Sequence, residues 1–137
     1  MFKHILLASL VLTATASWAD DSAATRPLFV RGEMNNWEAP KDAQLAETAP
    51  NVLVAKVALK ASHGAYKFKV ADEKWKGDTT YGQFDPTAKV TLDAPVQVKA
   101  GWQWSDMHFT PDADGTYSFT LDRTDAKKMT ITVKKAG

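Results

Sequence analysis

Hydrophobic and polar residues alternate along most of the chain after residue 25. The pattern is clearest in four segments: 53–59, 66–70, 117–121 and 129–133. Because neighbouring side chains of a strand point to opposite faces, each segment predicts a strand with one buried and one exposed face. Shorter strands are expected in four further segments: 28–31, 89–92, 96–98 and 107–110.

Turn-forming residues separate these segments. They are Asn35-Asn36, Ala49-Pro50, His63-Gly64, Asp85-Pro86, 93–95 and Asp114-Gly115. No helical periodicity of useful length is present, although residues 41–47 could hold one helical turn. About seven or eight short strands in a chain of this length indicate two packed antiparallel sheets. The sequence therefore predicts an all-β fold, an immunoglobulin-like antiparallel β-sandwich.

The first 19 residues have a different pattern from the rest of the chain. A basic start is followed by an apolar run over residues 5–12 and by small residues that end at Ala19. This is the pattern of a secretory signal peptide cleaved after Ala19, and the run is too short to span a bilayer. We therefore expect an exported protein, periplasmic or secreted, without a membrane anchor.

The remainder of the 137 residues fits a single domain. The polar segment 20–25 is expected to be a flexible leader, and residues 26–137 the folded module. The chain has 17 Lys and Arg against 16 Asp and Glu, and these balance once Lys3 is removed. A neutral chain has no field that attracts nucleic acid or an anionic membrane, which argues against both partners. Without cysteine, a packed core must hold the fold.

Four tryptophans follow the signal segment: Trp37, Trp75, Trp102 and Trp104. Trp37 comes directly after two turn-forming asparagines, and Trp75 lies among the charged residues of 72–76. A large apolar ring in such a polar loop is unfavourable unless something covers it. Each ring could fold back over a sheet edge, or the rings could stack against a ligand. The sequence pattern alone leaves both interpretations open.

Two motifs resemble the carbohydrate-binding modules of family 48 type. Residues 28–37 read LFVRGEMNNW, similar to the opening strand and turn of these glycogen- and starch-binding domains. Residues 64–75 read GAYKFKVADEKW and are followed by Tyr81-Gly82, similar to the family's lysine-bearing strand, turn and tryptophan. Residues 114–122 resemble the final hairpin of the pullulanase-associated versions. Other members occur in isoamylases, branching enzymes and the β-subunit of AMP-activated protein kinase.

The resemblance implies an α-glucan-binding module with a platform of two tryptophans. By motif position Trp37 and Trp75 match the platform, and Lys67 matches the lysine that donates to glucose hydroxyls. The family's asparagine is replaced here by Asp106, or by Ser105 beside it. This is a departure from the family, because an ionised aspartate accepts a hydrogen bond but cannot donate one.

The physical properties of these residues agree with that assignment. The axial C–H groups of glucose lie flat against an aromatic ring, while the hydroxyls at its rim need donors and acceptors. Lys67 is opposite in register to Tyr66 and Phe68, so it should face outward. Trp102 and Trp104 would share one face of an extended segment. They could lengthen the platform, or one could close the end of the sandwich while the other forms a hydrophobic patch for a protein partner.

Signals for catalysis or metal binding are weak. Residues 112–115 match part of a calcium loop, but a hairpin turn explains them better. His63 and His108 are far apart and have no metal-ligand spacing. Neither a nucleophile motif nor a glycine-rich phosphate loop is present.

We therefore expect a non-enzyme without cofactor or metal that binds an α-glucan polysaccharide or oligosaccharide. The alternative is a protein-interaction module of the same fold that has lost sugar binding. Such a module would dock onto a separate enzyme or envelope protein.

Overall fold

The structure, a computed structural model, describes residues 22–136. This part of the chain holds nine strands and four short 3-10 helices, and no α-helix. The predicted signal peptide lies outside the described residues. The strands are β1 (Leu28–Gly32), β2 (Ala46–Ala49), β3 (Val52–Leu59), β4 (Tyr66–Asp72), β5 (Thr80–Gln83), β6 (Val96–Ala100), β7 (Met107–Phe109), β8 (Gly115–Asp122) and β9 (Thr130–Lys135). The 3-10 helices are η1 (Glu33–Asn35), η2 (Lys41–Ala43), η3 (Ala61–His63) and η4 (Gly77–Thr79).

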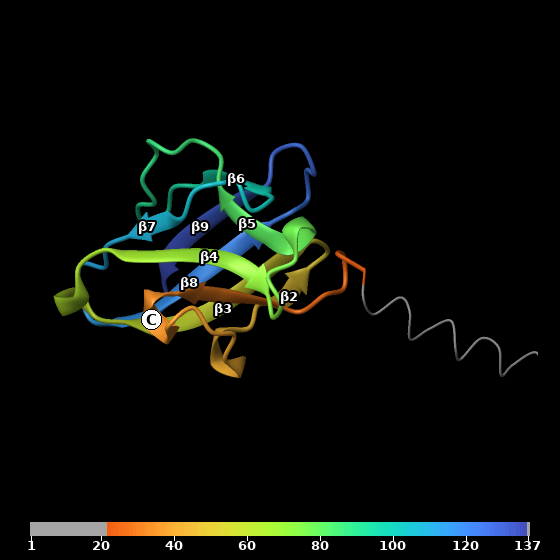
Figure 1. Ribbon diagram of the computed structural model, residues 1–137. Coiled ribbons are helices and arrows are strands. Elements are labelled where there is room, and N and C mark those ends of the chain that lie inside the picture. The colour runs from red at the N-terminus through yellow and green to blue at the C-terminus, as the bar shows by residue number, and fades with distance from the viewer. Residues whose placement is uncertain (1–21, 137) are drawn as a thin grey trace, which may run out of the picture.

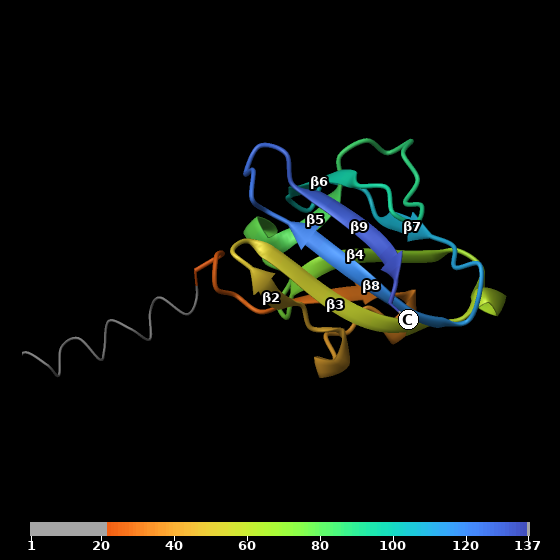
Figure 2. The same ribbon diagram turned by 180° about the vertical axis from the view of Figure 1, so that it is seen from behind.

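The strands form two layers. They follow the order β1-β4-β5-β6-β9-β8-β3-β2, with β7 paired to β4, and every pairing between them is antiparallel. The layer that contains β4 and β7 is nearest the viewer in Figure 1, and β3, β8 and β9 are nearest in Figure 2. β6 pairs with β5 on one side and with β9 on the other, so it joins the two layers. The predicted all-β antiparallel sandwich is confirmed.

The core lies between the layers and follows the alternation seen in the sequence. On β4, Phe68 and Val70 are fully buried while Lys67 between the buried positions is exposed. On β8, Phe119 and Leu121 are fully buried. The Phe68 and Phe119 rings meet edge to face across the layers, with centroids 5.1 Å apart. Burying each of these side chains contributes about 1.5–3 kcal/mol, which is what holds a fold without disulfides.

The strand expected at residues 89–92 is absent. Instead, this part of the β5–β6 connection makes two isolated parallel bridges, Val90 to Phe109 and Leu92 to Val133. Val90 is buried, so the apolar alternation in the sequence reflects contacts with the core rather than membership of a sheet. The prediction was wrong because alternate burial also arises when a loop crosses the end of a sandwich.

Two strands gave no signal in the sequence. β2 is an edge strand whose four residues are all exposed, so no hydrophobic alternation marks it. β5 is buried on both faces, and polar residues occupy half of it, so it also lacks a period of two. Of the segment 41–47, the first three residues form the helical turn η2 and the last two open β2.

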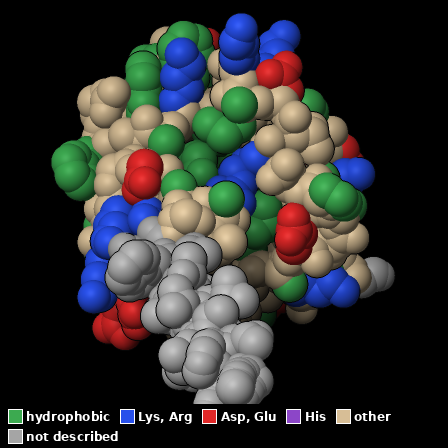
Figure 3. All heavy atoms as spheres, turned by 90° about the vertical axis from the view of Figure 1, so that its right-hand side faces the viewer, with side chains coloured by type: hydrophobic (Ala, Val, Ile, Leu, Met, Phe, Trp, Pro, Cys, Tyr) green, Lys and Arg blue, Asp and Glu red, His purple; other side chains and the backbone are tan. Residues whose placement is uncertain are grey.

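Charges are dispersed over the surface in view. Figure 3 shows Lys and Arg side chains interspersed with Asp and Glu, with small hydrophobic areas between them. No large area of one sign appears on this face, in line with the near balance of basic and acidic residues. Among residues 22–136, no helix has the length and apolar character needed to cross a membrane.

Candidate functional site

Trp37 is placed by a tight turn at the end of β1. The N–H of Gly32 donates to Asn35 Oδ1 at 3.0 Å, and Asn35 Nδ2 donates to the Val30 carbonyl at 2.9 Å. The Trp37 N–H then donates to the Gly32 carbonyl at 2.8 Å. A side chain at Gly32 would collide with β4, since its Cβ would lie 2.6 Å from Phe68 Cβ. The Gly-x-x-Asn spacing therefore returns the chain over the outer face of the sheet.

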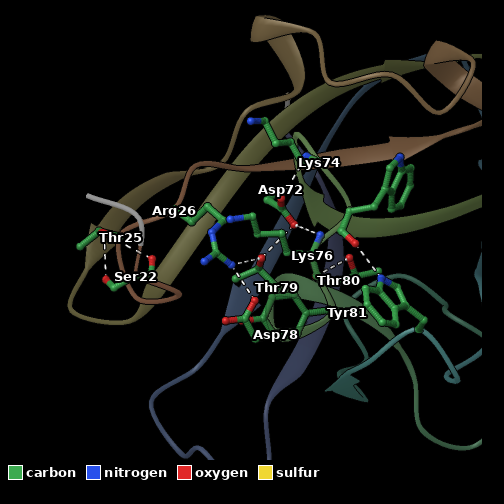
Figure 4. Close-up of polar contacts among 12 residues, drawn as sticks. Ser22, Thr25, Arg26, Asp72, Lys74, Lys76, Asp78, Thr79, Thr80 and Tyr81 are labelled. Atoms are coloured by element: carbon green, nitrogen blue, oxygen red, sulfur yellow. Dashed lines mark hydrogen bonds and ion pairs between the residues drawn. The ribbon is translucent and has the colours of Figure 1, made fainter. Parts of the chain in front are cut away.

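Trp75 is placed by a second turn, at the end of β4. Asp72 is buried, and its Oδ2 accepts the Lys74 N–H at 3.0 Å. Its Oδ1 accepts the Lys76 N–H at 2.7 Å and the Thr79 hydroxyl at 2.8 Å. Figure 4 shows Asp72 at the centre of these contacts. One carboxylate thus fixes the loop on both sides of Trp75.

Both tryptophans have a left-handed backbone. Trp37 has a φ of 62° and Trp75 a φ of 57°. The other non-glycine residues with positive φ in the described chain are of the two types that tolerate it, and they are Asn36, Asn51 and Asp93. A left-handed conformation costs a residue with a Cβ about 1–2 kcal/mol. Such strain persists where the surroundings impose it, and it concentrates at functional sites.

One buried arginine connects the two turns. Arg31 is only 7% exposed, and its guanidinium lies 3.9 Å from the centroid of the Trp75 ring. Its Nε donates to the Trp37 carbonyl at 2.8 Å, and one Nη donates to the carbonyls of Asp72 and Glu73 at 2.8 and 2.9 Å. Burial lowers the pKa of Arg31, and the neighbouring carboxylates of Asp72 and Glu73 oppose that shift. The Trp37 and Trp75 rings are 6.3 Å apart and tilted by 43°.

Trp102 extends this group. Its indole nitrogen donates to the Trp75 carbonyl at 2.6 Å. Its ring also lies beside Gly77, where an added Cβ would be 3.4 Å from the nearest ring atom. The residue is nevertheless 69% exposed. Its polar atom is therefore satisfied within the protein while much of the apolar ring meets solvent. We refer to Trp37, Trp75 and Trp102 as the tryptophan cluster.

Trp104 lies in a different environment. The segment that follows β6 is a turn, with Gly101 at a φ of 139°, rather than the extended chain assumed above. The Trp104 indole donates to the Ala100 carbonyl at 3.1 Å and packs 5.5 Å from the ring of Phe84. Lys99 Nζ lies over both rings, 4.4 Å from Phe84 and 5.6 Å from Trp104. The expectation that Trp102 and Trp104 share one face does not fit this turn.

The predicted polar residues lie on the same sheet. Lys67 is exposed, and its backbone N–H donates to Glu33 Oε1 at 3.0 Å. Lys69 follows Lys67 by two residues on β4, so both side chains lie on the same face of the sheet. Lys69 pairs in register with Arg31 on β1. Asp106 Oδ1 lies 3.8 Å from Lys69 Nζ, so its cationic neighbour is Lys69.

Four residues around the tryptophans were not among the candidates predicted from the sequence. They are Arg31, Lys69, Gly77 and Phe84. Arg31 had a usable signal, because a charge between the apolar residues of a short strand must point to the outer face. The contacts of Gly77 and Phe84 depend on how two loops fold back, and no local pattern encodes them.

The arrangement suits non-covalent binding on an open surface. Aromatic rings at one sheet, together with lysine donors on β4 and a carboxylate acceptor just before β7, can hold a ligand with flat apolar faces and polar edges. No group of three or more His, Asp or Glu that could hold a metal ion occurs in residues 22–136. A hollow of about 570 Å³ lies elsewhere, between residues 86–92 and β7, and none of the tryptophans lines it.

Comparison with known proteins identifies a shared fold. A scan against protein-family models finds no match to the chain, and a search of curated proteins finds none either. Among solved structures, the chain is similar to one described as "Ligand induced structure of AmyP-SBD", a starch-binding domain. The TM-score is 0.59 and the identity 24%, over 82% of this chain and 73% of that one. The chain therefore shares the β-sandwich fold of that domain.

Proposed function

We propose that the protein is a non-catalytic module that binds α-glucans such as glycogen, starch or maltooligosaccharides. The observation that carries the proposal is the tryptophan cluster. Two of its members sit in strained left-handed turns, and the third exposes 69% of its surface although its nitrogen is already bonded. A ligand that covers these rings would remove that apolar surface from water, at about 25 cal/mol per Å².

The geometry of the rings favours α-linked over β-linked glucose chains. Successive residues of an α-1,4-glucan turn relative to each other, so the chain curves, whereas a β-1,4-glucan is a flat ribbon. The Trp37 and Trp75 rings are tilted by 43°, with centroids 6.3 Å apart. Two adjacent glucose residues of the curved α-1,4-glucan can each face one indole. The flat β-1,4-glucan can lie against only one of the two tilted indoles at a time.

Polar groups on β4 and just before β7 would bind the sugar hydroxyls. We assign Lys67 and Lys69 as donors and Asp106 as an acceptor. By motif position Asp106, or Ser105 beside it, takes the place of the asparagine of family 48 modules, and the contact of Asp106 with Lys69 keeps its carboxylate near the outer face of β4. The Lys69–Asp106 pair supplies both a donor and an acceptor, the two functions that the amide of an asparagine combines in one side chain.

We also propose that the module is of family 48 type and that it is exported. The first part rests on the motifs of residues 28–37 and 64–75, and the fold shared with a starch-binding domain supports it. Export to the periplasm or beyond rests on the signal-peptide pattern of residues 1–19.

Calorimetric titration of the purified protein with maltoheptaose tests the proposal. Trp37→Ala and Trp75→Ala should each weaken binding by tenfold or more, which is about 1.4 kcal/mol. Phe84→Ala is the matched control, because Phe84 is an exposed aromatic residue outside the cluster. Cellohexaose should bind much more weakly than maltoheptaose. Unchanged affinity in both tryptophan variants would exclude the cluster as the sugar site.

A docking role is the second candidate. Two large hydrophobic side chains, Trp102 at 69% and Phe84 at 41%, are exposed on loops at the same sheet. Such residues are also typical of protein interfaces. Under this alternative a stoichiometric partner would co-purify with the protein and be lost in the Trp102→Ala variant, and maltoheptaose would not bind.

A further inference from the structure

Arg31 is in an unusual position for an arginine. It points outward from β1, yet only 7% of its surface is exposed, because the two tryptophan turns cover it. Arginine is rarely buried unless its charge is matched and its donors are used. Its guanidinium donates to three backbone carbonyls, those of Trp37, Asp72 and Glu73. The guanidinium is therefore committed to holding the main chain.

The three carbonyls belong to two loops that are distant in sequence. One is the carbonyl of Trp37 itself, and the other two open the turn that carries Trp75. The charged plane also stacks on the Trp75 ring, at 3.9 Å from its centroid. A single side chain thus contacts the backbone at one tryptophan and the ring of the other. Both residues are in left-handed conformations, which need such external restraint.

From these contacts we infer that Arg31 is the positioning residue of the tryptophan cluster, fixing the spacing and tilt of the Trp37 and Trp75 rings before a ligand arrives. The effect of this positioning on glucan affinity rests on the function proposed above. A platform ordered in advance loses less conformational freedom on binding, so it binds more tightly than a loose one with the same side chains.

The role requires the planar fork of arginine. A guanidinium presents five donors in fixed directions and stacks on an aromatic face while its edges donate. A lysine ammonium is a point charge on a flexible stem, and it cannot stack and bridge both loops at once. Arg31→Lys keeps the charge and removes the geometry. Arg31→Gln keeps a planar donor, leaves no buried charge, and serves if the lysine variant does not fold.

The test compares ring geometry and affinity in the same proteins. Two indoles this close give an exciton couplet in far-ultraviolet circular dichroism of the ligand-free protein, and Trp37→Phe removes it for reference. Arg31→Lys and Arg31→Gln should reduce the couplet toward that reference and weaken maltoheptaose binding at least tenfold. Arg123→Lys is the control, because Arg123 is also partly buried and donates to the Tyr81 hydroxyl at 3.0 Å. It should leave both readouts unchanged.

Two results would overturn the inference, and a third would limit it to the ligand-free protein. A folded Arg31 variant that keeps the full couplet overturns it, even if its affinity falls, because Arg31 would then act on the ligand directly. A lost couplet with unchanged affinity overturns the claim that positioning matters for binding. If the unmodified protein binds no glucan, the proposed function fails, and the couplet alone decides whether Arg31 positions the rings.

Discussion

Replacing Trp37 or Trp75 by glycine should leave a more stable protein than replacing the same residue by alanine. Both substitutions remove the same indole, so the lost packing is nearly equal and cancels in the comparison. What differs is the backbone, since φ is 62° at Trp37 and 57° at Trp75. Alanine retains the Cβ that makes this conformation costly, and glycine does not.

The magnitude follows from two opposing contributions. The left-handed conformation costs alanine about 1–2 kcal/mol, whereas glycine loses about 0.5–1 kcal/mol more conformational freedom on folding. The glycine variant should therefore be more stable by about 0.5–1 kcal/mol at each position. For a domain of this size that corresponds to roughly 2–5 °C in Tm.

Urea unfolding of the two pairs of variants measures the difference. Lys67 supplies the control pair, because it is an exposed residue in the extended backbone of β4. There the order should reverse, with Lys67→Gly less stable than Lys67→Ala. If alanine is as stable as glycine at both tryptophan positions, the left-handed turns are not strained and the structural reasoning about the site is wrong.

Three further outcomes are expected. Trp102→Ala should weaken maltoheptaose binding. It should change the free energy of unfolding, measured with urea, by less than about 0.5 kcal/mol, because the residue is 69% exposed. Gly82→Ala should destabilise the fold by about 1–3 kcal/mol, because its Cβ would lie 2.8 Å from the Ser105 carbonyl oxygen; a wild-type midpoint would contradict this close approach. Hydrogen bonds from Thr124 lower the pKa of Asp122 below 3.8. That carboxylate therefore stabilises the fold above pH 3.8 and loses its effect as the pH falls through the folded pKa, so Asp122→Asn and the unmodified protein should converge in stability only in acid.

The fold could be predicted wherever one face of a strand meets water. β4 and β8 alternate because each has the core on one side and solvent on the other. β2 and β5 could not be predicted, because one is exposed on both faces and the other is buried on both. Residues 89–92 gave a false signal, since a loop that packs its alternate residues on the core mimics a strand.

For the candidate site, the sequence singled out the two tryptophans that the structure brings together, but not the residues that hold them. Trp37 and Trp75 follow turn-forming residues in motifs that resemble a known family, and the structure brings their rings to 6.3 Å. Arg31 reaches carbonyls 41 and 42 residues away in the chain, which is a property of the folded sheet and not of any local pattern. Trp102 and Trp104 contact different residues because 101–104 is a turn and not an extended segment.

Affinity electrophoresis is the most direct measurement of α-glucan binding by the tryptophan cluster. The protein is run in native gels cast with glycogen, amylopectin, dextran or no polysaccharide, beside the variant that combines Trp37→Ala and Trp75→Ala. Glycogen and amylopectin should retard the unmodified protein, dextran should not, and the double variant should run freely in every gel. Equal mobility of the unmodified protein in all four gels would contradict α-glucan binding, and equal retardation of the double variant would contradict the tryptophan site.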